Sequence, residues 1–246
     1  MSFTSDGAAT SVARRPRVGF IVPPAEAVVP PEAIEMYGDD VDFIAFGLAL
    51  ERLTPEGYDA VQHKLVRAAS SLKADGVDAI ALMGTSLSFY KGAAYNEMLT
   101  KLLNEVSGLP SVTMSTAVVD ALTATGCRKV AVATAYGEAV NERLRSFLGE
   151  SGFEVTALEA LQIEDVSKVQ AVTDEQLIDL AMRTLDSGPK ADGLLISCGG
   201  LRTLGVTMTL QQRLGMPIVS SSTAGPWAAV RLVGHGGLAD GAPARA

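Results

Sequence analysis

The sequence contains few of the side chains that usually support metal, redox or disulfide chemistry. Its 246 residues include only two cysteines, two histidines and one tryptophan. Cys127 and Cys198 lie far apart and fit no zinc-ligand spacing, and two cysteines cannot build a disulfide framework. A Walker-type glycine motif is also missing. We therefore expect chemistry without a metal or other cofactor, in the reducing cytoplasm.

Basic residues are also in the minority. The chain has 20 Lys and Arg against 28 Asp and Glu, giving a net charge of −8 at pH 7. Nucleic acids and anionic membrane surfaces both require clustered basic residues, so neither is expected as a partner. No apolar run reaches the roughly 18 to 20 residues of a membrane span, and residues 1–16 lack the apolar core of a signal peptide. We expect a monomeric cytoplasmic protein that acts on a small molecule.

The rest of the chain alternates between apolar runs and segments with helical spacing. The apolar runs carry too few polar side chains for a sheet with one solvent-exposed face. This pattern predicts parallel sheets covered by helices on both faces. The predicted strands are 18–22, 43–50, 79–83, 111–114, 129–136, 153–158, 217–219 and one centred on Leu195; helices are predicted over 54–72, 93–106, 138–150, 174–186 and 201–214, with others ending near 125 and 233.

Two stretches of the chain repeat each other. Residues 77–86, VDAIALMGTS, match residues 191–200, ADGLLISCGG, with Asp78 aligned to Asp192 and Gly84 to Cys198. The repeat predicts an α/β protein of two pseudo-symmetric flavodoxin-like halves, each a four-stranded, mainly parallel sheet flanked by helices, with the active site in the cleft between them. The expected division is a disordered leader (1–16), a first half (17–126), a second half (127–233), whose terminal helix can pack on the first, and a flexible tail (234–246).

Cys198 is the first candidate for chemistry. It follows an apolar strand and precedes Gly199, Gly200 and a predicted helix, so its sulfur is expected at the carboxyl end of the sheet, facing helix N–H groups. The alternative is a buried, inert thiol, which is common for free cysteines. Cys127, in a turn before a predicted strand, fits the inert description. His63 in a helix and His235 in the tail do not favour a Cys–His pair.

Hydroxyl-bearing turns follow several of the predicted strands. Thr85 and Ser86 follow Gly84, and similar turns stand at residues 115–116 and 222–223. Such groups at a helix start can bind a carboxylate or an oxyanion, although they can also serve only as helix caps. Tyr136 ends a strand, where its phenol could donate a hydrogen bond to substrate or simply belong to the core.

At these residues the chain resembles the aspartate/glutamate racemase superfamily and, within it, the arylmalonate decarboxylase family. The resemblance covers residues 18 to about 233. Racemases and isomerases of the superfamily carry one cysteine in each half, whereas this chain has Gly84 at the first position, so a two-base route is not expected. The matching motifs are GFIVPP (19–24), TPEGYDAV (54–61), LMGTSLSFYKGAAYN (82–96), TMSTAV (113–118), VAVATAY (130–136), NERL (141–144), SCGGL (197–201) and IVSSSTAG (218–225).

The resemblance implies a cofactor-free carboxy-lyase that removes CO₂ from an α-aryl-α-alkylmalonate, a small dicarboxylate, and protonates one face of the resulting enediolate. By motif, Cys198 would be the proton donor. Thr85, Ser86, Tyr136 and the Gly199 backbone would form a dioxyanion hole. Leu50, Leu53, Val166 and Val169 would form the apolar pocket for the departing carboxylate, and Pro24, Tyr58, Leu87 and Gly200 would line the space for the other substituents.

The chain also departs from this pattern. Phe46, Glu51 and Arg52 stand where small residues are expected, and residues 159–170 are more polar than expected, which predicts an altered substrate size or rate. Two other functions stay open. One is a racemase or isomerase of the superfamily with a nonstandard second base; the other is a noncatalytic carboxylate-binding protein.

Overall fold

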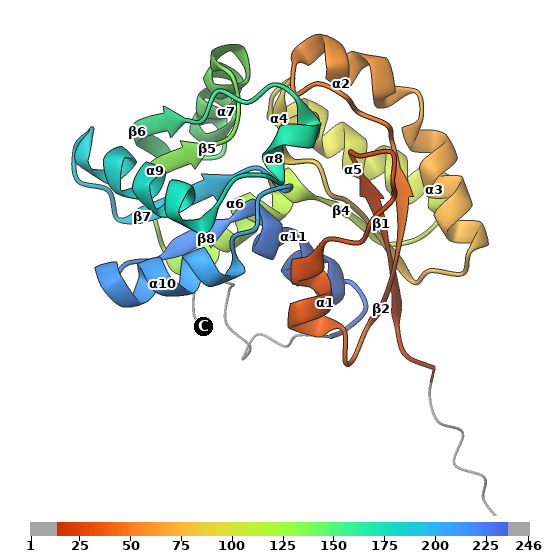
Figure 1. Cartoon of the computed structure of the whole chain (residues 1–246). Coiled ribbons are helices and arrows are strands. Elements are labelled where there is room, and N and C mark those ends of the chain that lie inside the picture. The colour runs from red at the N-terminus through yellow and green to blue at the C-terminus, as the bar shows by residue number, and fades with distance from the viewer. Residues whose placement is uncertain (1–13, 236–246) are drawn as a thin grey trace, which may run out of the picture.

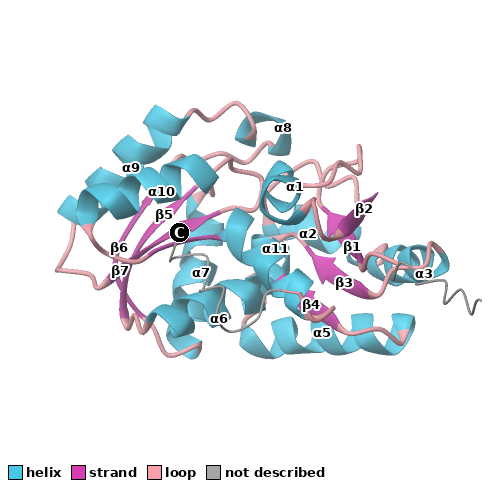
Figure 2. Cartoon of the chain, turned by 90° about the horizontal axis from the view of Figure 1, so that it is seen from below, coloured by secondary structure: helices cyan, strands magenta, loops and turns pink. Residues whose placement is uncertain are grey.

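The computed structural model describes residues 14–235, and these form two parallel sheets with helices on both sides (Figures 1 and 2). The first sheet has the strand order β2-β1-β3-β4 and the second has the equivalent order β6-β5-β7-β8. All pairings between these strands are parallel. The predicted α/β fold with two four-stranded halves is confirmed.

The first half alternates strands and helices in the predicted order. Pro55 opens its second helix and the Thr54 side chain caps that helix by accepting from Gly57 N at 3.3 Å. Gly108 ends the fifth helix in the left-handed conformation (φ 69°), which favours glycine. The elements are β1 (Arg17–Val22), α1 (Pro31–Tyr37), β2 (Asp42–Gly47), α2 (Pro55–Gln62), α3 (Leu65–Ala74), β3 (Ala79–Leu82), α4 (Thr85–Phe89), α5 (Ala93–Ser107), β4 (Ser111–Thr113) and α6 (Met114–Thr125).

The second half repeats this arrangement. Its α9 begins with a complete capping box, in which Thr173 and Gln176 satisfy each other's backbone N–H groups. The elements are β5 (Lys129–Thr134), α7 (Glu138–Glu150), β6 (Glu154–Ala160), α8 (Val166–Val169), α9 (Asp174–Asp186), β7 (Gly193–Ser197), α10 (Leu204–Leu214), β8 (Ile218–Ser220) and α11 (Ser221–Arg231).

The aligned aspartates have the same structural role in the two halves. Asp78 Oδ2 accepts from the backbone N of Arg17 at 2.8 Å, where β1 begins. Asp192 Oδ1 accepts from the backbone N of Lys129 at 2.9 Å, where β5 begins. A repeated side chain that holds the equivalent strand start supports the internal duplication that the sequence indicates.

The helix α11 lies between the two halves. It packs against α6 and α1 of the first half and against β7 and β8 of its own. Gly225 allows this close approach, because a Cβ there would lie 2.8 Å from the methyl carbons of both Met83 and Met114. The two halves therefore share one continuous core.

Some local predictions differ from the structure or lie outside the described residues. The helix predicted over 54–72 is divided into α2 and α3, with His63 and Lys64 between them. α1 and α8 were not predicted, since both are short. The predicted leader and tail lie largely outside the described residues, but Arg14 is placed and pairs with Asp78 at 2.6 Å. Within residues 14–235 no helix is long and apolar enough to cross a membrane.

Candidate active site

Cys198 lies directly after β7, in a turn that precedes α10. The predicted helix start at residue 201 is wrong, because α10 begins at Leu204. Gly199 and Gly200 disfavour continuation of a helix, and Thr203 has a non-helical backbone (φ −129°). The thiol therefore faces the N–H groups of a turn rather than those of the first helical residues.

The Cys198 thiol is protonated at neutral pH. Its side chain is 6% exposed, and this burial raises its pKa to about 11. The backbone N–H groups of Gly200 and Leu201 and the Tyr136 hydroxyl act in the opposite direction, but burial outweighs them. A buried thiol is suited to donating a proton and is a poor nucleophile in this state.

Gly84 occupies the equivalent place in the first half, after β3 and before α4. Its backbone conformation (φ −131°, ψ 97°) is one that any residue adopts. A Cβ at this position would lie 3.1 Å from Leu87 Cβ and 3.4 Å from Pro23 Cγ. The position is tight but not closed to a side chain, so glycine is not required here by the backbone.

Two tyrosines connect the two halves around Cys198. Tyr136 comes from the second half and its hydroxyl lies 3.4 Å from Ser197 Oγ, and the Thr85 hydroxyl of the first half lowers its pKa. Tyr58 comes from α2 of the first half; burial raises its pKa, and Cys198 raises it further once that thiol is ionised. Burial is the main cause of the raised pKa in both phenols. The carboxyl ends of β3 and β7 are thereby brought to one site.

The hydroxyl groups at this site are buried and only partly paired. Thr85 and Ser86 start α4 and are 3% and 4% exposed. Within the described part of the chain, Thr85 Oγ1 and the Tyr58 hydroxyl have no well-aligned hydrogen-bond partner, although Ser86 lies close enough to Tyr58 to lower its pKa. A buried hydroxyl without a partner is costly, so these groups are suited to a bound anion.

The other two hydroxyl turns have a structural role. Thr113 Oγ1 accepts from Thr116 N at 3.1 Å and caps α6, and Ser220 Oγ accepts from Thr223 N at 3.4 Å and caps α11. Ser115 Oγ donates to Thr85 O at 2.8 Å, which links α6 to α4. The capping side chains are thus Thr113 and Ser220, not the predicted hydroxyls at 115–116 and 222–223, and Ser115 fixes the start of α4.

Gly199 and Gly200 are closely packed. A Cβ at Gly199 would lie 2.5 Å from Met114 Sδ and 3.3 Å from the Met83 carbonyl oxygen, so the turn touches the first half. A Cβ at Gly200 would lie 3.2 Å from Val169 Cγ1. Only glycine at position 199 lets the backbone approach the first half this closely.

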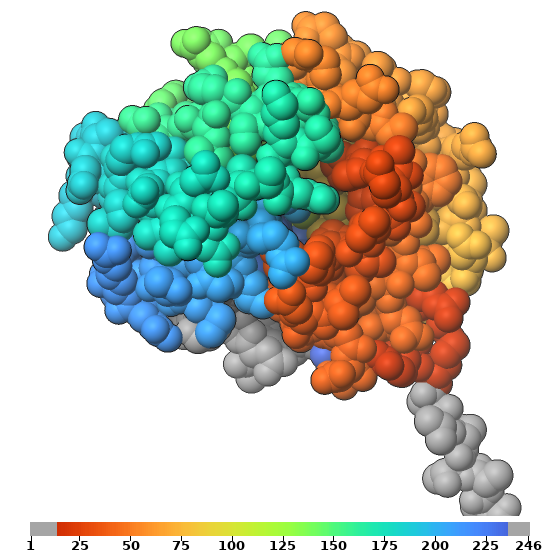
Figure 3. All heavy atoms as spheres, in the orientation of Figure 1, coloured from red at the N-terminus to blue at the C-terminus, as the bar shows by residue number. Residues whose placement is uncertain are grey.

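The predicted apolar pocket residues come from two segments that meet across the halves. Leu53 N donates to Glu164 O at 2.7 Å, and Val166 N donates to Glu51 O at 3.1 Å. Leu50, Leu53 and Val169 are buried and Val166 is half-buried. In Figure 3 the segment around α8 lies directly against the first half on the face shown. We call these paired segments, residues 48–53 and 161–166, the clasp.

The residues that depart from the family pattern are less buried than the predicted pocket residues Leu50 and Leu53. Arg52 and Glu51 are exposed, and the Arg52 guanidinium pairs with the Glu164 carboxylate across the clasp. Phe46 is half-buried in β2. Glu164 belongs to the segment 159–170, which is more polar than expected. Its ion pair with Arg52 gives a structural reason for one unexpected polar residue in each segment of the clasp.

Most predicted site residues are buried, but Pro24, Val166 and Gly199 are half-buried and Gly200 is exposed, so the site reaches the surface at the Cys198 turn. Two surface hollows beside α7 contain none of the predicted site residues. Among the described residues there is no group of three or more His, Cys, Asp or Glu that could hold a metal ion.

A family model of arylmalonate decarboxylase matches residues 18–244. The arylmalonate decarboxylase of Bordetella bronchiseptica is 49% identical over 227 residues, covering 92% of this chain and 94% of that protein. The chain belongs to the arylmalonate decarboxylase family. This membership confirms the expected enzyme class, a decarboxylase.

Solved structures agree with this assignment. A liganded double mutant of arylmalonate decarboxylase, with a glycine replaced by cysteine and a cysteine by serine, superimposes on this decarboxylase with a TM-score of 0.88. It is 48% identical, and the match covers 90% of this chain and 94% of that one. The maleate isomerase Iso from Pseudomonas putida S16 has a TM-score of 0.82 at 22% identity, with the same coverage, and shares the fold.

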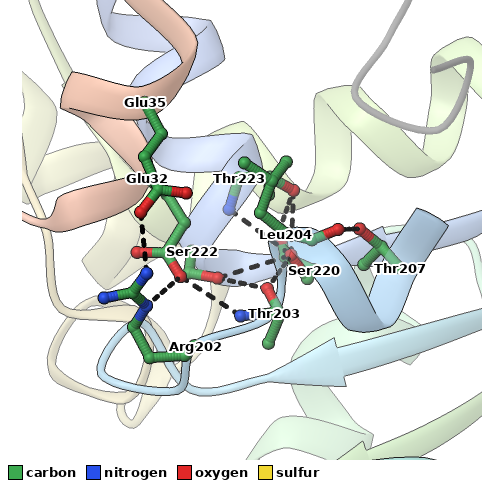
Figure 4. A network of polar contacts seen from close by, with 9 residues as sticks. All are labelled: Glu32, Glu35, Arg202, Thr203, Leu204, Thr207, Ser220, Ser222 and Thr223. Atoms are coloured by element: carbon green, nitrogen blue, oxygen red, sulfur yellow. Dashed lines mark hydrogen bonds and ion pairs between the residues drawn. The ribbon is translucent and has the colours of Figure 1, made fainter. Parts of the chain in front are cut away.

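Sequence reasoning did not identify Glu32 and Thr203, which join the two halves beside the Cys198 turn. Thr203 N donates to Glu32 Oε1 at 3.1 Å (Figure 4). The signal available was Pro31 followed by Glu32, a common helix start. That signal predicts α1 but not its partner, which is distant in the sequence.

Proposed function

We propose that this decarboxylase converts α-aryl-α-alkylmalonates into α-aryl propionates without a cofactor, with Cys198 as the only proton donor. The observation that carries the proposal is the buried, protonated Cys198 thiol facing Tyr136 and the Thr85 turn, with Gly84 at the equivalent position of the other half. One thiol can protonate one face of a planar intermediate. The product is therefore a single enantiomer.

The first step breaks the bond between the α-carbon and one carboxylate. The electron pair of that bond stays on the α-carbon and spreads into the retained carboxylate, giving an enediolate, while neutral CO₂ leaves. The Thr85, Ser86 and Tyr136 hydroxyls and the Gly199 N–H donate to the enediolate oxygens. These donors stabilise the transition state more than the substrate because negative charge grows on those oxygens.

The second step transfers the thiol proton from Cys198 to the α-carbon. The remaining thiolate takes a proton from water, so the net reaction consumes one proton and releases one CO₂. The Gly200 and Leu201 N–H groups and the Tyr136 hydroxyl, which favour the thiolate, stabilise it until it is reprotonated.

The departing carboxylate is placed against Leu50, Leu53, Val166 and Val169. These side chains offer no hydrogen bonds, so they disfavour the charged carboxylate relative to neutral CO₂. The clasp pairs the segments that carry Leu50, Leu53 and Val166, and Val169 lies beside Gly200 in the Cys198 turn. Their apolar character supports CO₂ release at this position.

Methyl(phenyl)malonate in D₂O, with a chelator and no added cofactor, tests the proposal. We expect CO₂ release and one enantiomer of 2-phenylpropionate with deuterium at the α-carbon, followed by NMR and chiral chromatography. Deuterium exchange into 2-phenylpropionate or aspartate without CO₂ release would instead identify a racemase. Thermal stabilisation by the malonate without turnover would identify a carboxylate-binding protein.

A further inference from the structure

The Glu32 carboxylate is buried at the boundary between the two halves, where the proposed mechanism does not use it. Glu32 lies in the first turn of α1 and is 2% exposed. Glutamate is rarely this buried unless it is paired. Burial raises the pKa of this carboxyl, while the Thr203 N–H and Arg202 lower it. Burying a carboxylate carries a desolvation penalty, so its retention at this position indicates a structural or functional role.

Apart from its own backbone N–H, the Glu32 carboxylate has its partners at the end of the Cys198 turn (Figure 4). Glu32 Oε1 accepts from Thr203 N at 3.1 Å and lies 3.6 Å from Arg202 Nε. Arg202 also donates to Glu35 Oε1 at 2.7 Å, one turn further along α1. One helix of the first half therefore holds two consecutive residues of a turn in the second half.

Thr203 is held from the other side as well. Its hydroxyl donates to Ser220 Oγ at 2.7 Å and is hydrogen-bonded to Ser222. Ser220 caps α11, so Thr203 is fixed between α1 and the start of α11. Thr203 is 1% exposed, and water cannot replace these contacts without rearrangement.

The turn between Cys198 and Thr203 contains two glycines and depends on its ends for its shape. Gly199 and Gly200 follow Cys198, and glycine has the greatest backbone freedom. The β7 strand fixes the turn before Cys198, and Thr203 fixes it after. We propose that Glu32 is a positioning residue, whose bond to Thr203 N–H fixes the direction of the Cys198 Sγ–H bond toward the substrate. This inference rests on the proposed role of Cys198 as proton donor.

Loss of this bond should affect protonation more than substrate binding. Of the proposed carboxylate-binding groups only the Gly199 N–H belongs to this turn, whereas Thr85 and Ser86 are on α4 of the other half. A displaced thiol lets water protonate either face of the enediolate. We therefore expect a lower kcat, a smaller change in KM and a lower enantiomeric excess, whereas a smaller folded fraction would leave the enantiomeric excess unchanged.

Three variants test the proposal. Glu32→Leu removes the acceptor and should lower kcat about 10- to 100-fold, the scale expected for a misplaced reacting group. Glu32→Gln keeps an acceptor oxygen and should recover most of kcat and of the enantiomeric excess. Glu35→Gln makes the same chemical change on the same helix but weakens only the exposed contact with Arg202, so it should keep the enantiomeric excess and lower kcat far less than Glu32→Leu. Unaltered kcat and enantiomeric excess in folded Glu32→Leu would overturn the proposal.

The alkylation rate of Cys198 by iodoacetamide gives a readout that does not depend on turnover. Peptide mass spectrometry separates Cys198 from Cys127, which packs against Gly193 and serves as the internal control. Cys198 should react several-fold faster in Glu32→Leu than in the unaltered protein, with Cys127 unchanged. Equal Cys198 rates would overturn the proposal. If the unaltered protein releases no CO₂, the proposed function fails, and this comparison alone still decides whether Glu32 orders the turn.

If Glu32→Leu does not fold, Glu32→Gln decides the question. Its weaker, uncharged acceptor should still accelerate Cys198 alkylation relative to Glu35→Gln, because a neutral hydrogen bond is weaker than one to a carboxylate. Identical Cys198 rates and identical enantiomeric excess in these two variants would contradict the proposed role of Glu32.

Discussion

The Tyr136 hydroxyl and the Cys198 thiol shift each other's pKa at the centre of the site. The phenol lowers the pKa of the thiol by a hydrogen bond, and the ionised thiolate raises the pKa of the phenol. Burial acts on both groups and is the larger effect, so both are protonated at neutral pH. The resting site therefore offers two proton-bearing groups from the second half next to Thr85 of the first.

The pH dependence of kcat follows from the raised pKa of Cys198. The donor must be a thiol, so kcat should stay level from neutral pH to about pH 10 and fall as the pH passes about 11. The same shift stabilises the fold fully below the ordinary thiol pKa of roughly 8.5, and this contribution is lost as the pH rises through about 11. Alkylation of Cys198 across this range measures the ionisation directly. A kcat that declines with a midpoint near 8 would contradict the assignment.

Thr85→Val tests the proposed dioxyanion hole. The change keeps the shape of the side chain and removes a buried hydroxyl without a well-aligned partner among the described residues. We expect kcat to fall about 10²- to 10³-fold, as when one oxyanion donor is removed. The melting temperature should stay level or rise, since removing an unpaired buried hydroxyl relieves a cost. An unchanged kcat would show that the Thr85 hydroxyl does not stabilise the enediolate.

Gly84→Cys places a second thiol opposite Cys198. The backbone accepts a side chain, and small shifts of Leu87 and Pro23 make room for it. The variant should racemise 2-phenylpropionate, because one thiolate can remove the α-proton while the other thiol returns one to the opposite face. Gly84→Ala provides the same crowding without a thiol. Racemisation no faster in folded Gly84→Cys than in Gly84→Ala would contradict the facing arrangement of the two positions.

Arg52→Ala tests whether the exposed side of the clasp affects the substrate pocket. The Arg52 and Glu164 side chains are 63% and 50% exposed, and exposed ion pairs contribute about 0 to 1 kcal/mol to stability. We expect a change within this range in urea denaturation and the same relative kcat/KM for malonates with small and large aryl groups. A changed preference would place Arg52 in the pocket. Glu154→Ala, which breaks the exposed pair with Lys129, is the matched control.

The strand positions and the general position of Cys198 could be predicted because they depend on local patterns. Apolar runs that end in Gly84 and Cys198 identify β3 and β7, and their repetition identifies the two halves. The helix pattern over 54–72 predicted one helix where there are two. Apolar residues on both sides of the break, such as Tyr58 and Leu65, are buried, so the apolar spacing alone does not show the break.

The contacts that close the site depend on residues far apart in the sequence. Glu32 reaches Thr203 across the halves, and the clasp pairs Arg52 with Glu164 and Leu53 with the Glu164 carbonyl. No local spacing marks such pairs. The start of α10 was misplaced for the same reason, since Thr203 N–H is bonded to Glu32 outside the helix.

Cys198→Ala is the most direct test of the central claim that Cys198 donates the proton. The side chain is small and 6% exposed, so its removal should leave the fold intact by circular dichroism and melting temperature. The measurement is product formation from methyl(phenyl)malonate by the variant and the unaltered protein under identical conditions. We predict that the folded variant forms no detectable 2-phenylpropionate. Full activity with a single enantiomer would show that another group protonates the enediolate.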